Sequence, residues 1–319
     1  MQQISLAESG FARTRKVTRK QVFLAEMERV VPWDRLMARI EPHYPVAGNG
    51  TQPYPLSAML RIHLLQQWFG YSDPAMEEAL HEVPLLRGFA GLDAGESRLP
   101  DETTILRFRR LLETHDLARS LFNEVAGLLA EKGLLLRSGT IVDATLIAAA
   151  PSTKNRDRKR DRDMSQTKKG QQWYFGMKAH IGADADSGLV HTVVGSTAKL
   201  GDAKVCDQLL HGDEQIVLGD RGYTSKARRI DAPREEGEPL YAMPFVRKPG
   251  EDLPHDQRQA NRLLASLRAK VEHPFRVLKR QFGYTKVRYR GLEKNTAQLH
   301  TLFACVNLWM ARKDLLAAG

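Results

Sequence analysis

Cysteine is scarce in this chain, and long apolar segments are absent. The 319 residues include two cysteines, Cys206 and Cys305. Two cysteines cannot form a disulfide framework or a zinc finger, so we expect both to be core residues of a reducing, cytosolic protein. No run of about 18 apolar residues occurs, which excludes a transmembrane helix. The N-terminal stretch lacks an apolar segment, so we expect no signal peptide.

Acidic residues are also in deficit. The chain has 48 Lys and Arg against 38 Asp and Glu, a formal net charge of +10. Hydrophobic residues make up 42% and charged residues 27%, which is typical of a packed globular protein rather than a disordered one. At about 150 residues per domain, the length predicts about two domains. The excess positive charge favours an anionic polymer as partner, with nucleic acid the leading candidate.

The first part of the chain, residues 1–132, predicts a helical domain. Apolar residues recur there at intervals of three and four. We expect helices over residues 58–69, 75–80, 104–113 and 117–131. The expected N-terminal caps of the first three are Ser57, Asp73 and Asp101. Two interpretations remain open: a helical bundle with solvated charges, or a DNA-binding bundle of helix-turn-helix character whose basic helix faces phosphates.

After residue 132 the pattern changes to the alternation of β-strands, which predicts an α/β domain over residues 133–319. We expect strands over residues 140–147, 173–183, 189–195, 216–218 and 241–246. The turn-rich segment DADSG joins the second and third strands as a hairpin. Trp173, near the start of the second strand, is expected to contribute to core and hairpin packing. Helices are expected over residues 203–210, 225–230, 256–281 and 296–315. This order predicts a mixed sheet with helices on both faces.

Three carboxylates stand out by their positions: Asp143, Asp220 and Glu272. Asp143 lies inside a β-branched strand, where a charge costs free energy unless a cation or hydrogen bonds satisfy it. Asp220 follows a short buried strand, at the edge of the sheet where ligands of open α/β sheets bind. Two Asp and one Glu suit a two-metal site for phosphoryl transfer, and their oxygen atoms select Mg²⁺ or Mn²⁺.

Other polar residues near these positions have simpler interpretations. Asp184 and Asp186 lie in the hairpin turn, where Asp is ordinary, and Asp202 follows a glycine and is expected to cap a helix. His180 is expected to be a hydrogen-bonded structural residue. For Glu272 the alternative is a helical salt bridge with Arg268 or Arg276.

Glu272 lies on the long predicted helix with cations on its own face. At about 100° per residue, Arg268 and Lys279 fall within about 40° of Glu272 on the helical wheel. Pro274 removes a backbone donor and is expected to kink the helix just past Glu272.

Two further stretches are strongly basic. A loop over residues 151–170 carries eight Lys and Arg against three Asp, and it is either a solvated loop or an arm that grips phosphates. Because it follows the strand of Asp143, we favour the second. Residues 247–290 hold twelve Lys and Arg against four Asp and Glu. The expected DNA-contacting residues are Arg107, Arg109, Arg110, Lys154, Lys168, Lys169, Arg276, Arg280, Lys286, Arg288 and Arg290.

Several long strings resemble one family. They are GTIVDATLIAAAPSTKN, QTKKGQQWYFGMKAHIGADADSGLVHTV, GDRGY and RAKVEHPFRVLKRQFGYTKVRYRGLEKN, with PLSAMLRIHLLQQWFGYSDPAMEEAL and PDETTILRFRRLLE nearer the N-terminus. The chain resembles the insertion sequence 5 family of bacterial transposases nearly end to end. This resemblance implies an RNase H-like core with an Asp-Asp-Glu metal site at Asp143, Asp220 and Glu272.

The resemblance also implies roles for neighbouring residues. Arg268 would orient Glu272, and Lys279 would hold a phosphate near the scissile bond. In related transposases a Tyr stands three residues before this Arg; here that position is Ala265.

The implied function is that of a transposase. It binds the terminal inverted repeats of an insertion sequence, cleaves at the element's ends and joins the 3′-hydroxyls to target DNA. The implied cofactors are two Mg²⁺ or Mn²⁺ ions, and the implied assembly is at least a dimer on double-stranded DNA. The implied location is the bacterial cytoplasm, in association with the nucleoid. Two alternatives remain: a metal-dependent nuclease without strand transfer, and an inactive descendant that binds DNA as a repressor.

Overall fold

The computed structural model describes residues 16–48, 52–92, 98–156, 158–247 and 250–318. The first residues, on which the expectation of no signal peptide rests, lie outside these ranges. The chain forms two compact units, one from residues 1–124 with 308–319 and the other from residues 125–307. The division between the units falls inside a helix, a few residues before the predicted domain boundary at residue 132. The end of the last helix also belongs to the N-terminal unit rather than to the second domain.

The N-terminal unit is helical, as predicted. Its α-helices are α2 (Arg19–Val30), α3 (Trp33–Ile40), α4 (Leu56–Phe69), α5 (Asp73–Glu82), α6 (Pro84–Phe89), α7 (Glu102–Thr114) and the first part of α8 (Leu117–Glu131). The apolar stripes predicted from the sequence are buried, with Leu60, Ile62 and Leu65 fully inaccessible. Burial of these stripes is what holds short helices together in water.

The predicted helix starts are correct in one case and wrong in two. Asp101 caps α7, because its Oδ1 accepts a hydrogen bond from the Thr104 N–H at 2.8 Å. Ser57 is not a cap, since α4 already begins at Leu56. The cap of α5 is Ser72 rather than Asp73: the Ser72 hydroxyl accepts from the Ala75 N–H at 3.3 Å. Asp73 is the first helical residue instead, where its negative charge interacts favourably with the helix dipole.

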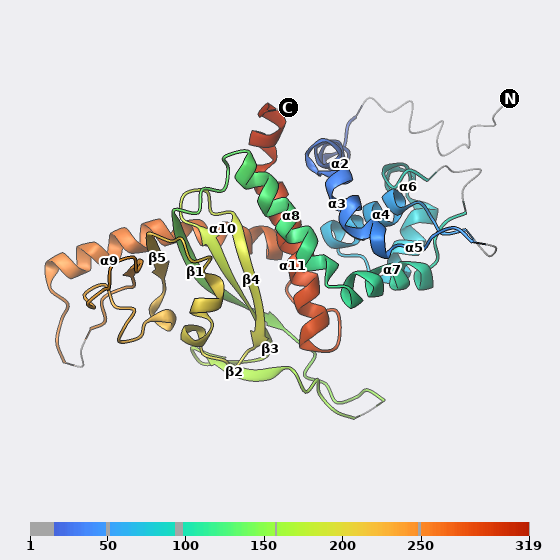
Figure 1. Cartoon of the computed structure of the whole chain (residues 1–319). Helices are drawn as coiled ribbons and strands as arrows, with labels where there is room; N and C mark the ends of the chain where they lie inside the picture. Colours follow the sequence, from blue (N-terminus) through green and yellow to red (C-terminus); the bar gives the residue numbers. More distant parts are fainter. Residues whose placement is uncertain (1–15, 49–51, 93–97, 157, 248–249, 319) are drawn as a thin grey trace. The chain divides into compact units, whose positions relative to one another are not determined.

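The second unit contains a six-stranded mixed sheet, in agreement with the predicted fold class (Figure 1). Its strands are β1 (Gly139–Ala148), β2 (Ser165–Lys169), β3 (Gln172–Asp184), β4 (Val190–Thr197), β5 (Ile216–Gly219) and β6 (Leu240–Ala242). The long strand β3 pairs antiparallel with β1, β2 and β4. Strands β1, β5 and β6 run parallel to one another. The predicted hairpin is confirmed as β3–β4, whereas β2 lies inside the segment predicted to be a loop.

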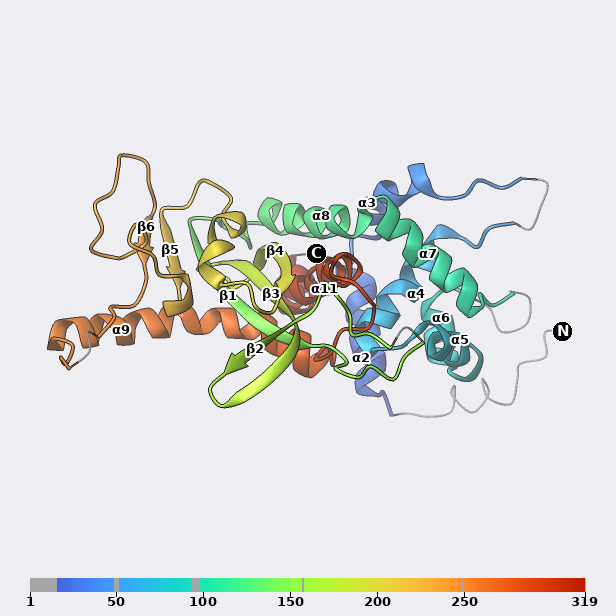
Figure 2. The same ribbon diagram turned by 90° about the horizontal axis from the view of Figure 1, so that it is seen from below.

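Helical segments pack on this sheet but are more broken than predicted. The stretch predicted as one helix over residues 256–281 consists of α9 (His255–Arg268), the 3-10 turn η5 (Ala269–Val271), α10 (Glu272–Arg276) and the π-turn η6 (Val277–Gln281). Figure 2 shows α9 running beside β5, and η5 contacts β1. Pro274 itself lies inside α10. The first interruption, η5, comes just before Glu272 rather than just past it, in the turn that precedes Pro274, because proline cannot donate the hydrogen bond to that turn.

Two other predicted helices differ. Residues 203–210 form the 3-10 turns η2 (Asp202–Lys204) and η3 (Cys206–Leu209), and residues 225–230 form turns without a helix. The core between η3 and the sheet contains Val142, Val217 and Cys206. Cys206 and Cys305 are both buried, as expected, and neither is in a disulfide. No helix within the described ranges is long and apolar enough to cross a membrane.

The long helix α11 (Leu292–Ala318) is fastened to β4 by one buried side chain. Asn307 is fully inaccessible, its Oδ1 accepts from the Val190 N–H at 2.8 Å, and its Nδ2 donates to the Val190 carbonyl at 2.7 Å. Both backbone groups of Val190 on the exposed edge of β4 are thereby satisfied.

We expect Asn307→Ala to lower the free energy of unfolding by about 3 kcal/mol, because it leaves a buried N–H and a buried C=O without partners. Urea denaturation followed by far-UV circular dichroism measures this loss. Asn123→Ala is the matched control: Asn123 is exposed on α8, and its replacement is expected to change stability by less than about 0.5 kcal/mol. Equal stabilities of the two variants would contradict the prediction.

Candidate active site

The structure brings Asp143 and Asp220 together from distant parts of the chain. Strands β1 and β5 pair in parallel, with Val142 opposite Gly219. Asp143 and Asp220 are the next residues on their respective strands, so the two carboxylates are neighbours where the pairing ends. The Asp143 Oδ1 accepts from the Ala144 N–H at 2.8 Å, and the Asp220 Oδ1 accepts from the Gly222 N–H at 2.7 Å. Each carboxylate is therefore oriented by the backbone immediately after it.

Asp143 carries an electrostatic cost in this position. Its pKa is raised to about 6, chiefly by burial and to a smaller extent by the negative charges of Asp220 and Asp202. The Ala144 N–H and the Arg268 guanidinium act in the opposite direction. A carboxylate held among like charges is a signature of a functional site, because its ionised form becomes favourable once a cation binds.

A third carboxylate, Asp202, approaches this pair at Gly222. A Cβ atom on Gly222 would lie 2.9 Å from the Asp220 Oδ1 and 3.0 Å from the Asp202 Oδ2, so any larger residue would collide with both oxygen atoms. The prediction that Asp202 caps a helix is wrong. The short turn η2 has no side-chain cap, and Asp202 instead forms an ion pair with Lys178, at 2.7 Å between Nζ and Oδ1.

His180 is a fully buried, hydrogen-bonded structural residue next to this cluster, as expected. Its Nε2 is 2.7 Å from the Ser196 hydroxyl and its Nδ1 is 3.4 Å from the Tyr223 hydroxyl. Burial lowers the His180 pKa to about 4, so the ring is neutral at physiological pH. Lys178 and Tyr223 are not among the site residues predicted from the sequence. The only available signal was that Lys178 and His180 fall on the same side of an alternating strand.

Glu272 occupies a different position from the two aspartates. It is exposed and is the first residue of α10, directly after the break in the helix. Within the described part of the chain, no three His, Cys, Asp or Glu side chains converge in an arrangement that could hold a metal ion. The structure thus assembles two of the three predicted ligands and does not bring the third to them.

Two cations that flank Glu272 in the sequence, Arg268 and Lys279, interact with groups of β1. Arg268 lies close enough to Asp143 for its charge to lower the pKa of that carboxyl. Lys279 donates from Nζ to the Leu146 carbonyl at 3.0 Å. Burial lowers the pKa of Lys279, and the charge of Lys169 lowers it further. These contacts place the helix face that carries Glu272 toward the strand that carries Asp143.

Most of the basic residues predicted to contact DNA lie on the surface. The exposed ones are Arg107, Arg110, Lys154, Lys168, Lys169, Arg276, Arg280, Lys286 and Arg290, and Arg288 is partly buried. Arg109 is different. Its side chain is only 11% exposed and forms ion pairs with Asp73 at 2.8 Å and Glu113 at 2.9 Å. The prediction that Arg109 faces phosphates is therefore wrong, since its charge is already neutralised inside the helical unit.

The expected core position of Trp173 is also wrong, because this side chain is 65% exposed. It lies opposite Lys168 in the β2–β3 pairing. The predicted strand is confirmed as β3, but the first residues of β3 extend past the part of the sheet that packs against the core.

A mixed sheet flanked by helices, with one aspartate inside a strand and a second directly after the neighbouring parallel strand, is the framework of RNase H-like enzymes. Residues 135–308 match the family described as Transposase DDE domain, and residues 12–111 match the family described as Transposase domain (DUF772). The first match covers more than half of the chain, so the protein belongs to the DDE transposase family, whose members generally use divalent metal ions. No solved structure matches it.

The raised pKa of Asp143 predicts a pH-dependent effect of Asp143→Asn on stability. Because the carboxyl pKa is higher in the folded state than its ordinary value, ionised Asp143 destabilises the fold. This cost is absent below about pH 4, grows up to about pH 6 and is complete above it. Without divalent ions, Asp143→Asn is expected to raise the free energy of unfolding by about 2 kcal/mol at pH 7.5 and not at pH 4. Urea denaturation in EDTA at both pH values measures the difference.

Asp213→Asn is the control for this effect, since the Asp213 side chain is 94% exposed. It is expected to leave stability unchanged at both pH values. A gain for Asp143→Asn that is the same at pH 4 and pH 7.5 would show that ionisation of Asp143 is not its cause.

Proposed function

We propose that this protein is the DNA transposase of a bacterial insertion sequence. It binds the terminal inverted repeats of its element, cleaves the DNA at the element's ends and joins the freed 3′-hydroxyls to target DNA. The observation that carries the proposal is the pair of Asp143, within β1, and Asp220, directly after β5, in a chain of the DDE transposase family.

The donor set fits divalent metal ions. Asp143 and Asp220 offer hard oxygen ligands. Burial and, to a smaller extent, the charge of Asp220 raise the pKa of Asp143, and a cation between the two carboxylates would offset that cost. Glu272 is the proposed third ligand. Two Mg²⁺ or Mn²⁺ ions held by these residues would lower the pKa of an attacking hydroxyl and stabilise the leaving oxygen of the phosphodiester. Asp143 and Asp220 enter this role already oriented by the Ala144 and Gly222 N–H groups.

The surroundings of Glu272 support its assignment. Arg268 and Lys279 lie on its side of the helix, and both reach β1. The buried Nε of Arg268 has no hydrogen-bond partner among the described residues, so it is free to donate to the Glu272 carboxylate and orient it. Lys279 lies beside Lys169, and this pair of cations is suited to holding a DNA phosphate next to the strand of Asp143.

The distribution of exposed cations supports DNA as the substrate. In the α/β unit they lie on the segment that follows β1, on β2, around α10 and η6, and on the segment before α11. In the helical unit Arg107 and Arg110 are exposed on α7, which supports end recognition by this unit. Two element ends must be paired before joining, so we propose at least a dimer on DNA.

Two other functions would use part of the same machinery. A metal-dependent nuclease on this framework would cut end-bearing DNA but would not join a supplied 3′-hydroxyl end to a target. A repressor would bind the ends without Mg²⁺ and leave the DNA covalently unchanged. The closely spaced Asp143 and Asp220 favour a catalyst over a repressor, because a protein that only binds DNA gains nothing from two repelling carboxylates.

The test combines purified protein, Mg²⁺, a duplex carrying a pre-cleaved element end and a supercoiled target plasmid. The wild type is expected to give a joined product. Asp143→Asn, Asp220→Asn and Glu272→Gln are each expected to lower the joining rate at least about a thousandfold while retaining end binding, since each removes a ligand worth several kcal/mol in the transition state. Asp213→Asn serves as the control and is expected to join at the wild-type rate.

The outcomes separate the candidate functions. Cleavage without joining would identify the nuclease, and binding without any change in the DNA would identify the repressor. Full activity of Glu272→Gln would show that Glu272 is not a ligand, and Glu251 or Glu293 would then be the next carboxylate to replace.

A further inference from the structure

The segment between β1 and β2, residues 151–164, is here called the basic arm. Two of its aspartates accept hydrogen bonds from backbone N–H groups at the start of α11. The Asp161 Oδ2 accepts from the Gly291 N–H at 2.7 Å, and the Asp163 Oδ2 accepts from the Leu292 N–H at 3.1 Å. The first N–H groups of a helix have no acceptors within it, and its dipole favours negative charge there. Carboxylates about 130 residues away in the sequence therefore cap α11.

The basic arm is also fastened at both ends. At its start, Ala148 of β1 donates to the Thr285 carbonyl at 3.1 Å and accepts from the Val287 N–H at 2.8 Å. At its end, Met164 is buried, and the Ser165 hydroxyl accepts from the Lys199 N–H at 2.8 Å. The arm thus lies against the segment 285–292, which contains the exposed residues Lys286 and Arg290.

Hydrogen bonds within the arm give it a defined conformation. The Asn155 Nδ2 donates to the Lys159 carbonyl at 2.7 Å, and the Asn155 Oδ1 accepts from the Lys159 N–H at 3.2 Å. The Arg160 Nε donates to the Pro151 carbonyl at 2.8 Å. Arg158 adopts a left-handed backbone with φ of 48°, which a residue with a side chain keeps only when its surroundings impose it.

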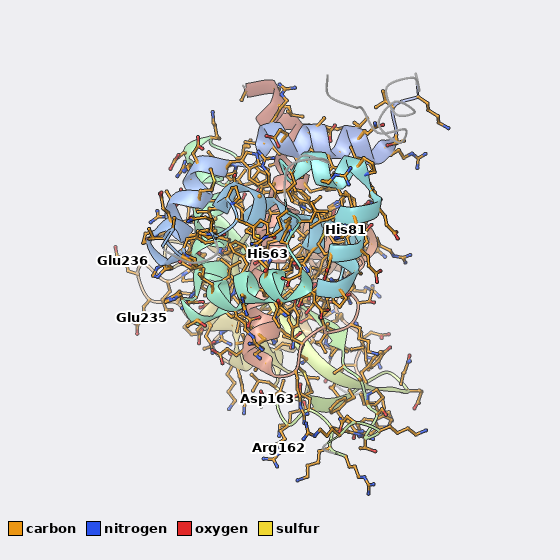
Figure 3. The ribbon with its side chains drawn as sticks, turned by 90° about the vertical axis from the view of Figure 1, so that its right-hand side faces the viewer. His63, His81, Arg162, Asp163, Glu235 and Glu236 are labelled. Carbon is orange, nitrogen blue, oxygen red and sulfur yellow. The ribbon has the colours of Figure 1, made fainter. Side chains whose placement is uncertain are left out.

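These contacts separate the charges of the arm. Asp161 and Asp163 direct oxygen atoms to the start of α11, where helix N–H groups offset their charge. The cations of the arm remain exposed: Lys154, Arg156, Arg158, Lys159, Arg160 and Arg162. Figure 3 labels Arg162 and Asp163, which project from neighbouring positions of the arm. The solvent-facing part of the arm is therefore strongly cationic even though its sequence contains acidic residues.

We propose that the basic arm is a prefolded surface for the phosphate backbone of duplex DNA, and that Asp161 and Asp163 hold it in its binding position by capping α11. The partner is the DNA backbone rather than a base sequence, because the exposed cations of the arm suit phosphates and its sequence contains no aromatic side chain to stack on bases. This inference rests on the proposed function, since it assumes that the chain binds DNA.

The decisive variant is the double substitution Asp161→Asn and Asp163→Asn. Simple electrostatics predicts tighter binding to DNA, because two negative charges disappear from a DNA-facing segment. The anchoring role predicts the opposite: Kd for DNA rises about tenfold, and the slope of log Kd against log salt falls by about two as phosphate contacts are lost. Fluorescence anisotropy with a labelled duplex of arbitrary sequence, in EDTA across a range of salt concentrations, measures both quantities.

A charge-matched control removes two acidic groups elsewhere in the same unit. Glu235 and Glu236 are exposed on a separate loop, and Figure 3 shows them apart from the arm. The double substitution Glu235→Gln and Glu236→Gln is expected to leave Kd unchanged or to lower it slightly. If the Asp161 and Asp163 variant binds as tightly as this control, or more tightly, the proposal is overturned.

Gly291→Ala provides a second route that leaves every charge in place. Gly291 has φ of 94°, and a Cβ atom there would lie 3.4 Å from the Asp163 Oδ2. The strained backbone would move the N–H groups away from the two aspartates, so we expect weaker DNA binding and faster tryptic cleavage within residues 151–164. Circular dichroism melting identifies any variant that fails to fold, in which case the other variant decides.

The outcomes keep this proposal apart from the proposed function. If the wild type does not bind the duplex at any salt concentration, the proposed function itself fails. If the wild type binds and Gly291→Ala binds equally well with an equally protected arm, only the anchoring role fails.

Discussion

The candidate active site depends on one unfavourable placement: the largely buried carboxyl group of Asp143 lies beside Asp220, where the pairing of β1 with β5 ends. The surrounding structure limits its cost. Backbone N–H groups orient both carboxylates, and Arg268 supplies a nearby positive charge. Lys178 neutralises the third carboxylate, Asp202, at 2.7 Å. The electrostatic cost that remains would be offset by a divalent cation, the ligand proposed for this site.

The positive charges of the chain also divide into two groups, those paired with carboxylates within the fold and those exposed at the surface. A net charge of +10 does not distinguish cations that stabilise the fold from cations that meet DNA. Arg109 is used inside the helical unit between two carboxylates, and Arg228 is paired with Asp207 at 2.7 Å. The cations that remain exposed lie on the basic arm, on β2 and on the segment before α11. In the arm Asp161 and Asp163 direct carboxylate oxygens toward the start of α11, where helix N–H groups offset part of their charge.

Elements with strong local signals could be predicted from the sequence, because burial of one face imposes a period on the residues. The helix over residues 117–131 is observed with those bounds, and β1, β3 and β5 each include the predicted strand. The predictions failed where a local preference competes with tertiary contacts. Proline at residue 55 allows α4 to begin before Ser57, and β2 forms in a polar stretch because β3 offers an unpaired edge. Trp173 is exposed because β3 extends beyond the packed part of the sheet.

The sequence by itself determined the class of protein, the mixed sheet and the identity of Asp143 and Asp220, since the charged residues interrupt otherwise apolar strands and the family strings surround them. Only the tertiary structure decided that Val142 lies opposite Gly219, that Asp202 joins the acidic pair through Gly222, and that Asp161 and Asp163 cap α11. It also left Glu272 exposed as the first residue of α10, directly after the 3-10 turn η5. The physical reason is that strand register and remote hydrogen bonds arise between residues far apart in the chain. No local period or propensity encodes those partners.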